Sequence, residues 1–286
     1  MGLAVSPNFK TDREIFVLGT FNDGQGKLVS RIIRFNEENG RGVNPQIIVD
    51  NLPAARIHSG GELSFGPDGM LYAAIGDVEK LNLVQDKNSA VGKILRFRRD
   101  GLIPPDNPFP NSPVFAIGVR NSQGFDWHPE SKEMFAVEHG PSGFPEENNR
   151  EHQDEMNVIL KGENYGWSIV SGIAEDTRFI NPLVDWTPAI APGNVTIIKD
   201  KKSPFTDRFL LPECAVNSCG ESRSKRQIIK PDGKLSMKNP FFINNLVGFA
   251  QLLSVPTDIC ILPTAIWTKA DASKNFLRRK MTVYLD

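Results

Sequence analysis

A repeat with a period near 62 residues constrains the fold of this chain more than any other sequence feature. The runs GLAVSPNF, GELSFGPDG and GFDWHPES each combine a glycine, alternating apolar residues, a proline and a polar turn. Their prolines, Pro7, Pro67 and Pro129, lie 60 and 62 residues apart. A period of this length with several short strands in each unit is typical of β-propeller blades. The sequence therefore predicts an all-β fold built from repeated blades.

A second series of strands keeps the same spacing. RIIRF ends at Phe35 and KILRF ends at Phe97, which again lies 62 residues further on. The pairs Asp68-Gly69 and Asp100-Gly101 predict tight turns. The alternative interpretation is a β-sandwich in which glycine and proline recur by chance, and three matched copies favour the propeller over it.

Charge and motif content exclude several functions. The net charge is −1, so no basic excess exists to bind nucleic acid or an anionic membrane. The sequence has no apolar run of transmembrane length, and its first residues lack the basic and apolar parts of a signal peptide. G-x-S-x-G, H-E-x-x-H, P-loop and G-x-G-x-x-G motifs do not occur. We therefore expect neither a serine hydrolase, nor a zinc protease, nor a nucleotide-dependent enzyme.

His58 and Asp77 form a candidate general-base pair. His58 precedes one predicted strand in RIHSGGEL, and Asp77 ends the next strand in AAIGD. The two positions can meet at the same end of an antiparallel hairpin, where the carboxylate would fix the tautomer of the imidazole. A histidine with a structural role in a loop is the other interpretation of this spacing.

Two further polar segments are candidates for ligand binding. Arg120, Asn121 and Gln123 offer a guanidinium and two amides, which suit a ligand rich in carbonyls and carboxylates. Residues 138–155 are acidic and supply the oxygen atoms that Ca²⁺ prefers, although without EF-hand spacing. Both segments can equally be solvated loops.

From residue 2 to about residue 195 the chain resembles the soluble sugar dehydrogenases that depend on pyrroloquinoline quinone (PQQ). The resemblance rests on NLPAARIHSGGELSFGPDGMLYAAIGD, GVRNSQGFDWHP, EHGPSG and DEMNVILKGENYGW, in this order. It implies a six-bladed β-propeller, a single domain over residues 1–286, with the quinone in a central depression. It also implies a periplasmic or extracellular location.

The resemblance implies oxidation of an aldose to a lactone. A histidine base takes the proton of the anomeric hydroxyl while hydride passes from C1 to the quinone, and an external electron acceptor completes the cycle. The residues carried over by matching are His58 as the catalytic base, Asp77 as the carboxylate that orients it, Arg120, Asn121, Gln123 and Gln85 as PQQ contacts, the carbonyls of Gly140 and Pro141 as ligands of the cofactor's Ca²⁺, and Glu155 with the carbonyl of Tyr165 at a second Ca²⁺.

The resemblance weakens after about residue 205. The basic residues that the family uses to hold the carboxylates of PQQ are not recognisable in RFLLPECAVNSCGESR or after INNL, and strand alternation is lost. We expect family-like blades over residues 1–204 and degenerate or frame-disturbed final blades over 205–286, so that the propeller is incomplete. The chain also opens inside the family pattern, without its signal peptide and opening strand.

Two alternatives to the dehydrogenase stay open. An incomplete cofactor site would leave a propeller that binds a sugar or a partner without redox chemistry. A Ca²⁺-dependent propeller hydrolase of the lactonase type would need a carboxylate-rich metal centre, which the R-N-S-Q run disfavours. The preferred aldose, the electron acceptor and the oligomeric state are not predicted.

Overall fold

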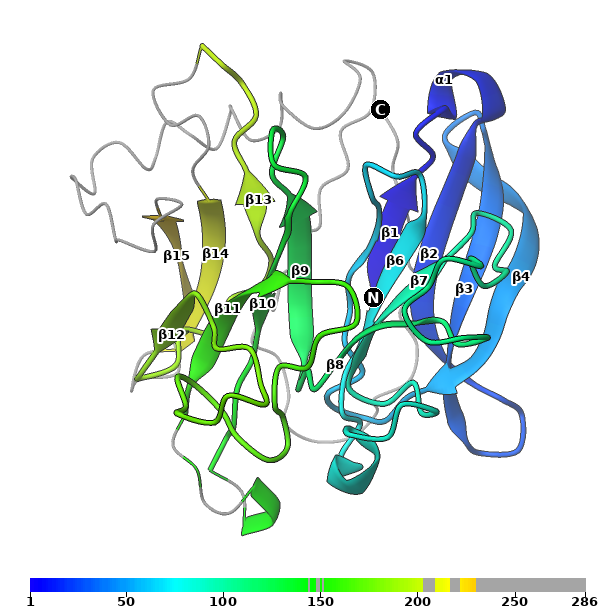
Figure 1. Ribbon diagram of the computed structural model, residues 1–286. Coiled ribbons are helices and arrows are strands. Elements are labelled where there is room, and N and C mark those ends of the chain that lie inside the picture. Colours follow the sequence, from blue (N-terminus) through cyan, green and yellow to red (C-terminus); the bar gives the residue numbers. More distant parts are fainter. Residues whose placement is uncertain (144, 148–149, 151, 203–208, 217–221, 230–286) are drawn as a thin grey trace.

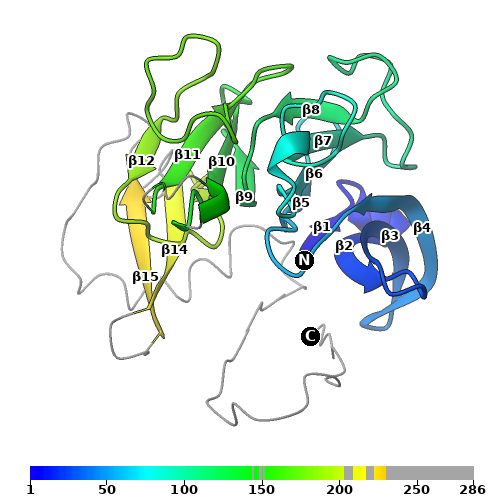
Figure 2. The same cartoon turned by 90° about the horizontal axis from the view of Figure 1, so that it is seen from below.

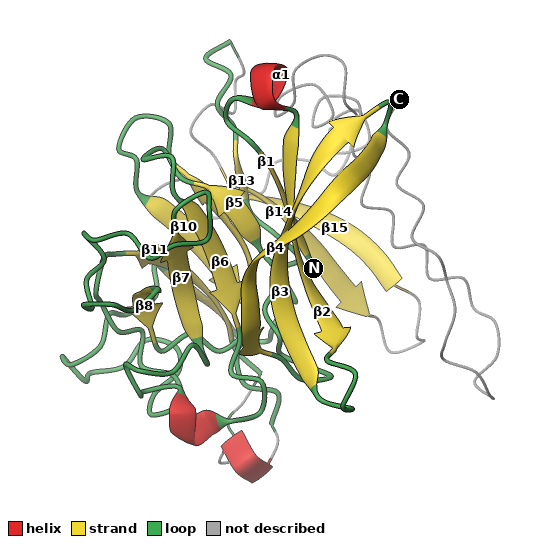
Figure 3. Ribbon diagram, turned by 90° about the vertical axis from the view of Figure 1, so that its right-hand side faces the viewer, coloured by secondary structure: helices red, strands yellow, loops and turns green. Residues whose placement is uncertain are grey.

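The computed structural model describes residues 1–143, 145–147, 150, 152–202, 209–216 and 222–229. Within these ranges the chain forms antiparallel sheets and three short helical turns (Figure 3). The turns are α1 (Phe9–Asp12), η1 (Leu81–Leu83) and η2 (Pro145–Glu147). The expected all-β architecture is therefore confirmed.

Each sheet consists of consecutive strands, so the chain completes one sheet before it begins the next. The first sheet contains β1 (Gly2–Val5), β2 (Glu14–Asn22), β3 (Leu28–Glu38) and β4 (Arg41–Pro53). The second contains β5 (Leu63–Phe65), β6 (Leu71–Ile75), β7 (Lys93–Phe97) and β8 (Val114–Ile117). The third contains β9 (Ser122–Trp127), β10 (Met134–Glu138), β11 (Asp154–Ile159) and β12 (Val184–Trp186). The fourth contains β13 (Thr196–Ile197), β14 (Phe209–Val216) and β15 (Ser222–Ile229).

The sheets follow one another around a common centre, as propeller blades do. Figure 1 shows them side by side, and Figure 2 shows them from below in chain order. The leading strands β1, β5 and β9 lie innermost in Figure 2; β1 contacts β5, and β9 contacts β13. The described residues form four sheets, so the number of six blades stays a prediction.

The glycines that lead the first and third repeats, Gly2 and Gly124, permit close approach at the centre. A Cβ atom at Gly2 would lie 2.6 Å from the carbonyl oxygen of Gly61, and one at Gly124 would lie 2.1 Å from the Asn194 side chain. Any larger residue would push the inner strands apart. At Gly2 and Gly124 the glycine of the sequence pattern is therefore required by packing between blades, whereas at Gly61 a Cβ would make only ordinary contacts.

The core lies between neighbouring sheets. Period-2 alternation places the apolar side chains on the faces that meet. The first two sheets bury Phe16, Ile32, Leu71 and Leu95; the second and third bury Tyr72, Ile94, Phe125 and Trp127; the third and fourth bury Phe135, Val137, Ile197, Phe209 and Leu211.

Two strands lie beyond residue 205, where the sequence shows no strand alternation. β14 and β15 pair there in antiparallel register. Phe209 and Leu211 are fully buried, and the ring of Phe209 lies 4.6 Å from that of Phe135. The contact between these two rings packs β14 against the third sheet. The rest of the degenerate blades predicted for 205–286, including all of 230–286, lies outside the described residues.

Among the described residues, no helix has both the length and the apolar character needed to cross a membrane.

Candidate active site

The candidate site lies where loops of the second and third sheets meet. Antiparallel pairing brings the start of β5, the end of β6, the start of β9 and the end of β10 to one edge. His58 comes before β5, Asp77 follows β6, and Arg120 leads into β9. The prediction that His58 and Asp77 meet across a hairpin is confirmed, because Nδ1 of His58 lies 3.0 Å from Oδ1 of Asp77.

Two contacts fix the tautomer of His58. Asp77 accepts a hydrogen bond from Nδ1, and Nη2 of Arg120 lies 3.2 Å from Nε2, where it can only donate. The imidazole therefore carries its proton on Nδ1 and keeps a lone pair on Nε2. Its side chain is 13% exposed, against 1% for Asp77. The backbone of His58 has φ = 52°, a conformation that non-glycine residues rarely adopt and that recurs at functional sites.

Asp77 is held from a second side by a residue that the sequence analysis did not assign. Nε1 of Trp167 donates to Oδ2 of Asp77 at 2.8 Å. The backbone N–H of Glu79 donates to Oδ1 at 3.2 Å. Both carboxylate oxygens are thus engaged. Trp167 closes the run NYGW, but the run contains nothing that places it against a residue 90 positions earlier.

Arg120 is buried, with a relative exposure of 2%, and its guanidinium is fully engaged. Nε donates to Glu147 at 2.8 Å, Nη1 donates to the carbonyl of His139 at 2.9 Å, and Nη2 donates to Ser142 at 2.9 Å. Glu147, which no sequence pattern singled out, forms a buried ion pair with Arg120 through its carboxylate. A buried guanidinium needs such a partner to offset its desolvation.

The other predicted cofactor contacts fall into two groups. Oδ1 of Asn121 accepts hydrogen bonds from the N–H of Gly60 at 3.2 Å and from Nε2 of Gln123 at 2.9 Å, so both amides lie beside the His58 loop. Gln85 is held elsewhere: its amide exchanges hydrogen bonds with Asn164 and donates to the carbonyl of Trp167. Gln85 therefore borders the site through the Trp167 loop and does not contact Asn121 or Gln123.

A second part of the site contains two facing carboxylates. Glu138 and Glu155 are paired across β10 and β11 and are 4% and 6% exposed. Nδ2 of Asn157 donates to both, at 2.8 Å and 3.3 Å. Burial, followed by repulsion from Glu155, raises the pKa of Glu138. Burial also raises the pKa of Glu155, although hydrogen bonds from Gly172 and Asn157 oppose this shift.

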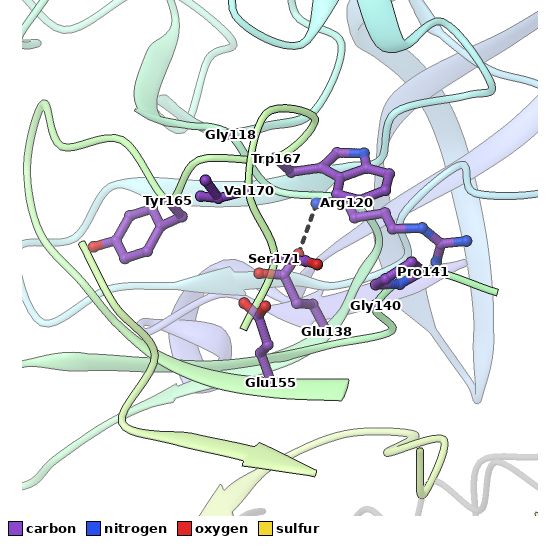
Figure 4. A pocket seen from close by; sticks show the side chains of 10 residues that line it. All are labelled: Gly118, Arg120, Glu138, Gly140, Pro141, Glu155, Tyr165, Trp167, Val170 and Ser171. Atoms are coloured by element: carbon purple, nitrogen blue, oxygen red, sulfur yellow. Dashed lines mark hydrogen bonds between the residues drawn. The ribbon is translucent and has the colours of Figure 1, made fainter. Parts of the chain in front are cut away.

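The residues predicted to bind Ca²⁺ meet in one cavity. Glu155, Gly140, Pro141 and Tyr165 line it together with Glu138 and Arg120 (Figure 4). The hydroxyl of Tyr165 donates to the carbonyl of Val158 at 2.6 Å, so its side chain is committed to the core. Within the described ranges, no group of three or more His, Cys, Asp or Glu side chains is placed to hold a metal ion. A cation here would therefore depend on two carboxylates and on backbone carbonyls.

The donor set fits PQQ and Ca²⁺ on chemical grounds. A guanidinium and two amides next to an imidazole match a group that carries carboxylates and carbonyls. The facing Glu138 and Glu155 supply hard oxygen ligands, and a divalent cation would remove their mutual repulsion. Arg120 can bind a further anion only in competition with Glu147, because that carboxylate already occupies it.

Comparisons with known proteins identify the family. Residues 1–212 match the family model of Glucose / Sorbosone dehydrogenase. Quinoprotein glucose dehydrogenase B of Acinetobacter calcoaceticus is 30% identical over 208 residues, which cover 63% of this chain and 41% of the relative. The structure of an oxidoreductase (glucose dehydrogenase) from Thermus thermophilus superposes with a TM-score of 0.66 at 32% identity, covering 82% of this chain and 75% of that one. The PQQ-bound aldose sugar dehydrogenase of Streptomyces coelicolor gives a TM-score of 0.63 at 25% identity, covering 84% and 76%.

The matched part of the chain spans 54% and 41% of the length of two curated relatives, a Synechocystis protein and the Acinetobacter enzyme. The family match nevertheless covers all the residues that form the candidate site. Because this match covers most of the chain, the chain belongs to the glucose/sorbosone dehydrogenase family.

Proposed function

We propose that this chain oxidises an aldose at C1 to the corresponding lactone, with PQQ and Ca²⁺ bound at the site described above. The observation that carries the proposal is the imidazole of His58, fixed between Asp77 and Arg120 with a lone pair on Nε2. Sugar oxidation at an anomeric hydroxyl requires a base of this kind. PQQ, when bound, supplies the two-electron acceptor that the protein's own side chains lack.

His58 would accept the hydroxyl proton at Nε2. Asp77 would stabilise the imidazolium that forms, because its carboxylate already faces Nδ1 at 3.0 Å. The Nε2 lone pair accepts a hydrogen bond from Nη2 of Arg120, so the sugar hydroxyl would displace this N–H before His58 takes its proton. The imidazole's low exposure of 13% limits access of water to the base.

Arg120, Asn121 and Gln123 would hold PQQ through its carboxylate and carbonyl oxygens, with Gln85 supporting the neighbouring loop. The carbonyls of Gly140 and Pro141 would bind one Ca²⁺. Glu155 and the carbonyl of Tyr165 would bind a second. An external electron acceptor and a location outside the cytoplasm are parts of this proposal that rest on family resemblance.

The proposal is tested by reconstituting the full chain with PQQ and Ca²⁺ and measuring aldose-dependent reduction of a dye, with the lactone identified by NMR. His58→Ala should lower turnover by about 10²- to 10⁴-fold. The matched control is His128→Ala, because His128 follows the opposite end of β9 and caps a turn there. Equal losses in the two variants would contradict the role of His58. Lactone hydrolysis without PQQ would instead support a hydrolase.

A further inference from the structure

Trp167 connects the two halves of the site. It follows β11 and is 4% exposed. Its indole N–H donates to Oδ2 of Asp77. The centroid of its ring lies 5.5 Å from the guanidinium carbon of Arg120, and both residues line the cavity in Figure 4. Apart from His58 itself, Trp167 is the one described side chain that contacts both Asp77 and Arg120 in the hydrogen bonds and cation–π contacts given above.

We propose that Trp167 is a positioning residue whose indole N–H holds Asp77 in the orientation that keeps His58 in its Nδ1–H tautomer. This inference rests on the proposed function, in which His58 acts through Nε2. Trp167 contacts Asp77 and not the reacting atoms, so its effect passes through the carboxylate.

The geometry explains why one donor matters. Oδ1 of Asp77 receives N–H groups from His58 and Glu79, while Oδ2 receives the indole N–H of Trp167 at 2.8 Å. Without the indole N–H, Oδ2 would lose this donor in a site where Asp77 is 1% exposed. A buried acceptor that loses its donor gains by turning toward another one. Rotation of the carboxylate would release Nδ1 of His58.

The ring of Trp167 is itself fixed. Arg120 and Arg150 stack on it at 5.5 Å and 5.3 Å. The backbone N–H donates to the carbonyl of Gly118 at 3.1 Å. Phenylalanine can also accept cations on its faces. Trp167→Phe therefore removes the N–H while it keeps an aromatic ring beside the two guanidinium groups.

The chain offers a matched control in Trp186. This residue is also buried, with an exposure of 7%, but its indole N–H has no hydrogen-bond partner in the described part of the chain. Trp186→Phe makes the same chemical change without removing a hydrogen bond. A general effect of shrinking a buried indole would appear in both variants.

The test measures the tautomer of His58 and turnover in separate experiments. Nitrogen-15 NMR of histidine-labelled chain, without PQQ, should show Nδ1–H in the wild type and in Trp186→Phe. It should show a mixture of tautomers in Trp167→Phe. After reconstitution with PQQ and Ca²⁺, kcat of Trp167→Phe should fall about tenfold to hundredfold. KM should change by less than about threefold, since the base is misplaced while the sugar contacts stay.

An unchanged tautomer in Trp167→Phe, or equal changes in both phenylalanine variants, would overturn the proposal. If the wild type fails to oxidise aldoses, the proposed function fails, but the NMR comparison still decides the role of Trp167. If Trp167→Phe does not fold, the hydrogen bond between Trp167 and Asp77 is tested instead by comparing the indole N–H signals of Asp77→Asn with those of the wild type. The Trp167 signal should shift and exchange faster with water, while the Trp186 signal stays in place; no shift at Trp167 would contradict the hydrogen bond.

Discussion

Glu155→Gln should have opposite effects on stability in the absence and presence of Ca²⁺. In wild type, Glu138 and Glu155 are buried and accept hydrogen bonds from one amide nitrogen of Asn157, at 2.8 Å and 3.3 Å. The accepting oxygens therefore lie within about 6 Å of each other. At that distance two negative charges repel by about 3 kcal/mol at an effective dielectric constant of about 20.

The pH dependence follows from the raised pKa values of both groups, which are caused first by burial. A carboxyl whose pKa is raised by folding contributes stability below its unfolded pKa and loses it as pH rises through the folded value. Without Ca²⁺, the variant should therefore match wild type near pH 5. At pH 8 its free energy of unfolding should exceed that of wild type by about 2 kcal/mol, because glutamine removes one charge and keeps one acceptor oxygen.

Calcium should reverse the order. A ligand that binds only the folded state at a hundredfold excess over its Kd stabilises by about 2.7 kcal/mol, and the variant lacks one charged ligand. The assay is urea unfolding followed by tryptophan fluorescence, in EDTA and in CaCl₂, at pH 5 and pH 8. Glu130→Gln is the control, because its side chain is 68% exposed. A variant that is less stable than wild type by the same amount in both solutions would refute the account.

Three further changes test other parts of the structure. Burial raises the pKa of Glu62 to about 8. The wild type should therefore lose up to about 1.4 kcal/mol of unfolding free energy per pH unit as Glu62 ionises between pH 5 and pH 8. Glu62→Gln should reduce this loss in urea unfolding. Lys93 is fully buried and donates to the carbonyls of Val84 and Val91 at 2.5 Å and 2.6 Å; Lys93→Met should lower the free energy of unfolding by about 1–3 kcal/mol, and unchanged stability would contradict this role. Gly140→Ala should lower the melting temperature more than Gly69→Ala does. A Cβ at Gly140 would lie 1.4 Å from the carbonyl oxygen of Gln153, whereas one at Gly69 would meet no atom within 4 Å and would be strained only by φ = 75°; equal losses would contradict the clash.

The sequence pattern predicted those features of the fold and of the site that depend on the spacing of residues within one repeat. The repeated Gly and Pro positions indicated blades, and the order of strands within a hairpin was enough to bring His58 to Asp77. Arg120 and Asn121 were candidates because of their residue types at the start of a strand, and their contact with PQQ stays a prediction. The blades were inferred from the repeat pattern, and the approach of His58 to Asp77 was inferred from the geometry of antiparallel strands.

The rest depends on contacts between loops that are distant in sequence. Trp167 reaches Asp77 from 90 residues away, and Glu147 reaches Arg120 from 27 residues away. Neither loop has a periodic pattern, so nothing in the sequence specifies which side chain turns inward. In the part of β14 whose burial is described, Phe209 and Leu211 are the fully buried residues, and two such residues are too few to predict a strand from the sequence.

The most direct test of the central claim is a single turnover without any external acceptor. The full chain is loaded with PQQ and Ca²⁺ under anaerobic conditions and mixed with an aldose, and the absorbance of the quinone is followed by stopped flow. One equivalent of PQQ per chain should be reduced in wild type and in His128→Ala. In His58→Ala the reduction should be about 10²- to 10⁴-fold slower at unchanged PQQ occupancy. Reduction at the wild-type rate in His58→Ala, or no reduction in wild type loaded with PQQ, would contradict it.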